Sequence, residues 1–84
     1  MITQAELDRG IEIVKGGELR TFAMTHSVLG KVIMSYCEGE FEFDLGAVGF
    51  VWCDEVEIVR NVIALRKGPD TIAVLNTEHI EVAE

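Results

Sequence analysis

The sequence predicts an α+β fold in which an N-terminal helix packs on a small antiparallel β-sheet, a sheet that can also curl into a barrel-like form. Residues 1–17 carry helix signals, whereas the rest of the chain has short runs of β-branched and aromatic residues separated by turn residues. No linker, repeat or low-complexity tract divides the 84 residues. We therefore expect a single domain over residues 1–84.

The helix is expected to begin after Thr3. Thr3 and Glu6 have the spacing of a capping box, and Ile2 and Leu7 occupy the flanking hydrophobic-staple positions. Apolar residues recur at helical spacing through positions 7, 11 and 14, and two glycines at 16 and 17 end the pattern. A helix of about 13 residues is marginal alone, so its apolar face must pack on another element.

Two strands are expected next, over residues 19–25 and 31–37, because both runs are rich in strand-forming residues. Residues 26–30 would connect them. A single helix over residues 20–36 is the alternative, since several apolar side chains can share one helical face, namely Phe22, Leu29, Val32, Ile33 and Tyr36.

Residues 38–45 alternate carboxylates with phenylalanine, leucine or glycine. In an extended strand one face would carry Gly39, Phe41, Phe43 and Leu45, and the other a row of carboxylates, Glu38, Glu40, Glu42 and Asp44. The interleaved phenylalanines do not suit a Ca²⁺ loop. The acidic row is either a solvated face that protects a sheet edge or a docking face for a basic partner.

Residues 54–67 support two interpretations. Asp54 as N-cap, with Arg66 and Lys67 before Gly68-Pro69, fits a helix. A strand is preferred because the segment contains many β-branched residues, Val56, Ile58, Val59, Val62 and Ile63. The glycines at 46 and 49 indicate a bend, residues 68–75 fit a hairpin, and a polar turn at 76–78 leads to a short strand at 80–82.

The net charge of −8 is concentrated in the middle of the chain: residues 32–59 contain seven acidic residues and no Lys or Arg. Nucleic-acid binding depends on Lys and Arg, so we expect no direct nucleic-acid partner. The negative electrostatic field of this segment instead attracts a basic protein surface. Trp52 lies among these acids, either in the core or as an interface anchor. The candidate partner-binding residues are therefore Glu38, Glu40, Glu42, Asp44, Asp54, Glu55, Glu57 and Trp52.

Motifs for chemistry are weak. Cys37, Cys53, His26 and His79 could supply zinc ligands, but none is paired at the short separation typical of zinc sites. Neither serine at 27 nor 35 lies in a nucleophile motif, and residues 29–32 lack the first glycine and the hydroxyl of a phosphate loop. We predict a protein that is not an enzyme, with no catalytic residue, no cofactor and no metal.

The apolar content predicts self-association. Hydrophobic residues make up 49% of a chain with little interior in which to bury them, so we expect a homo-oligomer. The longest apolar run, residues 45–53, is too short to span a bilayer as a helix, and no secretory signal or disulfide framework is evident. We expect a cytoplasmic protein with no membrane partner.

These observations favour a non-catalytic acidic protein-interaction module. It would be a small inhibitor that docks on the basic, nucleic-acid-binding surface of a partner protein, as acidic inhibitors encoded by phages do; the comparison is one of charge and size. A homo-oligomeric structural or regulatory subunit is the alternative. A small-molecule-binding or enzymatic protein is the third reading.

Overall fold

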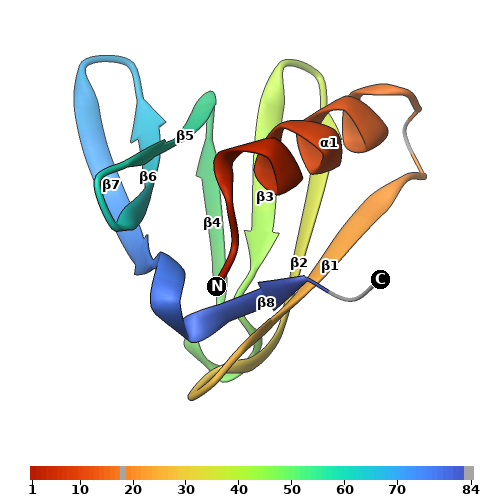
Figure 1. The fold of residues 1–84 in the computed structure, drawn as a ribbon. Coiled ribbons are helices and arrows are strands. Elements are labelled where there is room, and N and C mark those ends of the chain that lie inside the picture. The colour runs from red at the N-terminus through yellow and green to blue at the C-terminus, as the bar shows by residue number, and fades with distance from the viewer. Residues whose placement is uncertain (18, 83–84) are drawn as a thin grey trace.

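The computed structural model describes residues 1–17 and 19–82. In these residues one α-helix, α1 (Gln4–Lys15), precedes eight strands (Figure 1). The strands are β1 (Thr21–His26), β2 (Gly30–Cys37), β3 (Glu40–Asp44), β4 (Phe50–Cys53), β5 (Glu55–Val59), β6 (Val62–Lys67), β7 (Asp70–Asn76) and β8 (Ile80–Val82), with 3-10 helices η1 (Gly46–Val48) and η2 (Thr77–His79). The predicted α+β class is confirmed.

The strands form two antiparallel sheets. One has five strands in the order β4-β3-β2-β1-β8, and the other has three in the order β5-β6-β7. Asp54 alone separates β4 from β5, so the chain passes from one sheet to the other at this residue. Its N–H donates to the carbonyl of Arg66 at 2.9 Å, and its carboxylate accepts the N–H of Gly68 at 3.0 Å. Across the described residues the strands are therefore divided between two sheets and not closed into a single barrel.

Helix α1 lies across the five-stranded sheet (Figure 1), where it contacts β1 and β2, and it also contacts β5. The predicted capping box is present: Thr3 Oγ1 accepts the N–H of Glu6 at 3.2 Å, and Glu6 Oε1 accepts the N–H of Thr3 at 3.0 Å. Gly10 permits a close approach, because a Cβ there would lie 2.6 Å from the ring of Phe22. The helix is thus held by its cap and by contact with β1.

The core lies between α1 and the inner faces of both sheets. Phe22, Met34 and Phe43 stand opposite one another across β1, β2 and β3, and all are buried. Ile63 and Leu65 of β6 are fully buried from the second sheet. Residues 21–26 and 30–37 form the paired strands β1 and β2, in which alternate side chains are buried, so the alternative helix over residues 20–36 is wrong.

The segment 54–67 is a hairpin of two strands, β5 and β6, joined at residues 60 and 61. The strand interpretation is therefore correct in kind but missed the turn, and the helix alternative is wrong. Asp54 and Arg66, which resembled residues at helix ends, make other contacts in the hairpin. Asp54 caps the turn between β6 and β7, and Arg66 pairs with Glu55 and Glu57 across the hairpin.

The predicted acidic strand over 38–45 is shorter than expected. β3 begins at Glu40, and Glu38 with Gly39 forms the two-residue turn from β2, with φ of 51° and 86°. Left-handed backbone at both positions is the conformation that favours glycine and asparagine in tight hairpins. Glu38 therefore lies in the turn that precedes β3 and is not the first residue of the strand.

Candidate functional site

The outer face of the five-stranded sheet, on the side away from α1, carries most of the candidate residues. The register places Glu42 directly between Ser35 of β2 and Trp52 of β4. Asp44 likewise stands directly opposite Phe50. Each aromatic side chain that β4 presents outward is therefore a cross-strand neighbour of a carboxylate.

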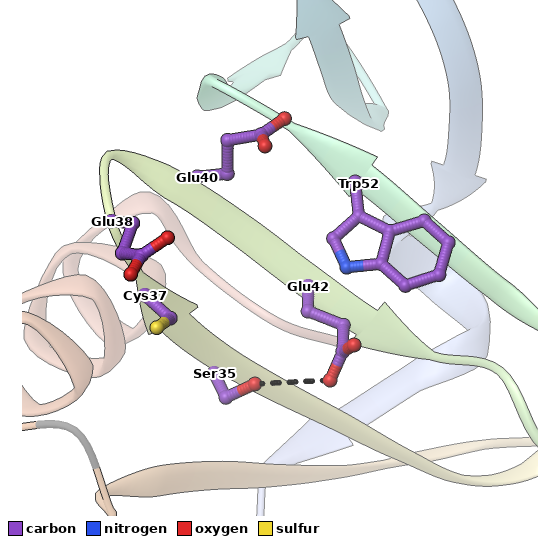
Figure 2. Close-up of a pocket in the computed structure, with 6 residues that line it drawn as sticks. All are labelled: Ser35, Cys37, Glu38, Glu40, Glu42 and Trp52. Carbon is purple, nitrogen blue, oxygen red and sulfur yellow. Dashed lines mark hydrogen bonds between the residues drawn. The ribbon is translucent and has the colours of Figure 1, made fainter.

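These side chains border a hollow of about 280 Å³, lined by Ser35, Cys37, Glu38, Glu40, Glu42 and Trp52. Figure 2 shows the β2 residues on one side, the indole on the β4 side and the β3 carboxylates between them. The indole is seen face-on in this view, and Trp52 is about half exposed. We call this site the acid–aromatic hollow.

The acid–aromatic hollow holds more negative charge than its neighbours neutralise. Glu40 pairs with Lys67 of β6 at 3.0 Å, and both side chains are about half exposed. Glu42 has a hydroxyl partner, the Oγ of Ser35 at 3.5 Å. Within the described residues Glu38 and Glu42 form no ion pair. An exposed pair such as Glu40–Lys67 contributes about 0–1 kcal/mol and can be exchanged for a partner's cation.

Trp52 and Phe50 are outside the core. Their side chains are 48% and 55% exposed, and their rings stack with centroids 5.9 Å apart. By contrast Phe41 and Phe43, on the opposite face of β3, are buried. An exposed aromatic pair on a small domain is typical of a binding surface, because apolar surface of this kind is otherwise placed in the interior.

The other four predicted acids lie outside the hollow, although Asp44 is on the same outer face. Asp44 accepts the N–H of Gly46 at 2.9 Å and so holds the loop before η1. Asp54 stands at the crossing between the sheets. Glu55 and Glu57 lie on the outer face of the three-stranded sheet, where both contact Arg66. The structure therefore gathers Glu38, Glu40 and Glu42 with Trp52, and it separates the remaining four acids from them.

Sequence reasoning missed Ser35, Cys37 and Phe50. Phe50 could have been found, because it lies two residues before Trp52 in a strand and must share its face. Ser35 and Cys37 could not, since their place beside the carboxylates depends on the register of β2 against β3.

The cysteines and histidines do not come together. Cys37 is exposed in the acid–aromatic hollow, whereas Cys53 is buried on the opposite face of the sheet. Burial raises the pKa of Cys53 to about 11, with further contributions from the negative charges of Asp54 and Glu40. In the described part of the chain no group of three or more His, Cys, Asp or Glu side chains is arranged to hold a metal ion.

The contact between Ser27 and His79 is the nearest arrangement to a nucleophile and its base. Ser27 Oγ lies 2.8 Å from His79 Nδ1, and the Ser27 N–H also donates to the His79 carbonyl at 2.8 Å. Both residues are exposed, and no carboxylate in residues 1–17 or 19–82 hydrogen-bonds the histidine ring. Without such an orienting group the pair serves to tie the β1–β2 turn to η2.

Comparisons with protein-family models, curated proteins and solved structures found none that matches this chain. Among the described residues, α1 lacks the length and apolarity to cross a bilayer, and no other helix has them.

Proposed function

We propose that this chain is a non-catalytic protein-interaction module that binds a basic segment of a partner protein at the acid–aromatic hollow. The observation that carries the proposal is the direct cross-strand pairing of Glu42 with an exposed Trp52, beside a carboxylate-lined hollow. A Lys or Arg side chain can lie against the exposed part of the indole and place its charge among the carboxylates.

Two kinds of interaction would then act on the same side chain. The ring attracts the cation by about 0.5–2 kcal/mol, depending on how far the contact is desolvated. The carboxylates of Glu38 and Glu42, which form no ion pair with the residues that the structure describes, supply charge complementarity and speed encounter with a positively charged surface. The stacked Phe50 extends the apolar part of the surface for the stem of the bound side chain.

The finer proposal concerns the partner. A groove that binds nucleic acid is rich in Lys and Arg, and β3 presents carboxylates at alternate positions, about 6.6 Å apart at the usual rise of a strand. A protein that occupies such a groove excludes the nucleic acid, so the module would act as an inhibitor.

The direct test uses Trp52 as the reporter, since it is the chain's one tryptophan. Octa-arginine and octa-lysine peptides are titrated into the protein and the fluorescence is followed, with a glycine-serine peptide of equal length as control. We expect saturable binding that weakens as salt rises. Glu42→Gln should weaken it about tenfold, or about 1.4 kcal/mol.

The matched control is Glu12→Gln on the exposed surface of α1, which changes the net charge equally. Trp52→Ala, followed by calorimetry, should also weaken binding about tenfold. Equal effects of Glu42→Gln and Glu12→Gln would show that only net charge matters, and the proposed site would then be wrong.

The partner is sought by affinity capture from the native host with wild-type and Glu40→Lys/Glu42→Lys baits. A genuine partner is retained by the wild type and lost from the doubly substituted bait, whose circular dichroism spectrum is unchanged. If the partner binds DNA or RNA, adding that nucleic acid should displace it. A partner that binds both baits equally, or that holds its nucleic acid and the module together, contradicts the inhibitor proposal.

A further inference from the structure

Strand β7 forms an open edge of the second sheet. In the described chain it pairs with β6 alone, and Figure 1 shows it at the outside of the molecule. It has seven residues, whereas the other edge strands β4, β5 and β8 have four, five and three. A long open edge presents unpaired N–H and C=O groups to another strand, and proteins usually shorten such edges or place charges on them.

The β7 edge lacks that protection. Its one ionisable side chain is Asp70 at its first position. Two of the other edges carry excess acidic charge: β5 has Glu55 and Glu57 against the single cation of Arg66, and the outward residues of β4 stand beside the β3 carboxylates. The remaining edge, β8, is short, and its Glu81 pairs with the N-terminal ammonium. The chain has a net charge of −8, so two copies repel each other wherever carboxylates meet. The edge at which two copies can meet with least repulsion is β7.

The side chains of β7 also favour contact. Val74 and Ile72 are 56% and 44% exposed, and Val59 of β5, on the same sheet, is 38% exposed. Val74 and Val59 lie on the same face of the sheet as Glu57, because Val74 and Glu57 both pair with Ala64 and Val59 is two residues beyond Glu57. Ile63 and Leu75, on the opposite face, are buried. Ile72 is the extra residue of the irregularity between Leu65 and Arg66. β-Branched residues on an edge strand are good pairing residues, and little desolvation of charge opposes their burial.

We propose that two copies of this chain associate edge to edge through antiparallel pairing of their β7 strands. A two-fold axis through Ala73 sets Asp70 of each copy opposite Asn76 of the other and Ile72 opposite Val74. The two three-stranded sheets become one six-stranded sheet. The acid–aromatic hollow belongs to the other sheet, so the dimer does not depend on the proposed partner binding and leaves both hollows open.

The test is sedimentation equilibrium from micromolar to several hundred micromolar protein. We expect the average mass to rise from 9.3 kDa toward twice that value. Val74→Lys should raise the dissociation constant at least about tenfold, because a lysine on an edge strand discourages strand pairing and replaces a β-branched contact with Ile72 of the other copy. Val28→Lys is the matched control: it makes the same substitution at an exposed valine in the β1–β2 turn and should dimerise like the wild type.

Hydrogen exchange gives the second measurement, since edge pairing protects outward amides of β7 at high concentration. Added salt should leave the dimer unchanged or strengthen it, because screening reduces repulsion between the two acidic chains. Three outcomes would overturn the proposal. The protein could stay monomeric at every concentration, the two lysine variants could dimerise equally, or amide protection at high concentration could be confined to strands other than β7. A monomer whose β7 amides become protected only with a foreign strand would also overturn it.

Discussion

On the outer face of the three-stranded sheet, Arg66 lies beside both Glu55 and Glu57. On the outer face of the five-stranded sheet, the equivalent neighbour of Glu42 across β3 and β4 is an exposed tryptophan. Both faces come from strands in which acidic residues alternate with apolar ones. The side chain on the adjacent strand therefore determines the charge of an acidic row. An arginine there neutralises part of it, whereas a tryptophan leaves the negative charge exposed.

The first prediction concerns Cys53, where burial and the nearby negative charges of Asp54 and Glu40 act together. Its folded pKa of about 11 lies above its ordinary value of 9.0, so the protonated thiol stabilises the fold fully below pH 9 and this contribution is lost as pH rises through 11. The loss should reach about 2–3 kcal/mol. The loss is measured by urea denaturation of the wild type and of Cys53→Ala between pH 8 and 11. The variant has no thiol at this position and should lack this part of the pH dependence.

Glu40→Gln sharpens the same prediction. Burial is the larger cause of the raised pKa and would remain, but one of the two nearby negative charges would be gone. The folded pKa of Cys53 should therefore be lower, so the decline in stability should end at lower pH and its total size should be smaller. Identical pH dependence for the wild type and Cys53→Ala between pH 9 and 11 would contradict the raised pKa.

The second prediction compares one carboxylate from each face. Glu57→Gln should lower the free energy of unfolding by about 1 kcal/mol, because the partly buried Arg66 loses a charged partner. Glu42→Gln should change it by less than about 0.5 kcal/mol, and in the stabilising direction, since it relieves repulsion between carboxylates. Urea denaturation of both variants at low salt makes the comparison. Equal losses would mean that the two faces do not differ in this way.

The third and smallest effect concerns the two turn residues with left-handed backbone, Glu38 beside the hollow and Arg60 in the β5–β6 turn, with φ of 51° and 59°. Glu38→Asn should stabilise the protein by about 0.5–1 kcal/mol and Arg60→Gly by a similar amount, because each relieves a conformation unfavourable to the native residue. Only Glu38→Asn should also weaken peptide binding. Thermal melts measure the change in stability, and fluorescence titrations measure the change in peptide affinity. Equal losses of affinity in the two variants would show that Glu38 does not contribute to binding at the hollow.

Much of the fold was predictable because its signals are local. The capping box at Thr3, the alternating burial of β3 and the turn at Gly68-Pro69 each depend on residues close together in the sequence. The turn at Arg60-Asn61 was missed because neither residue is a glycine, and Asp54, Arg66 and Lys67 carried charges that also suit helix ends.

The candidate site was predictable only in part, because its assembly depends on register. Alternation placed Glu40 and Glu42 on one face, but Glu40-x-Glu42 and Glu55-x-Glu57 look alike in the sequence. What separates them is the position of Arg66, which stands opposite Glu55 only after the β5–β6 hairpin has formed. The register of strand pairing therefore contains information that charge counting does not.

The placement of the β7 edge and the hollow on different sheets has a consequence for affinity. If two copies pair through β7, the assembly carries two hollows on one rigid body. A partner with two basic segments, or a repeating basic surface, would then be bound bivalently, and the second contact would form at a high effective concentration. Weak single-site affinity for one Lys or Arg would in that case suffice for tight retention, and Val74→Lys would lower avidity without altering either hollow.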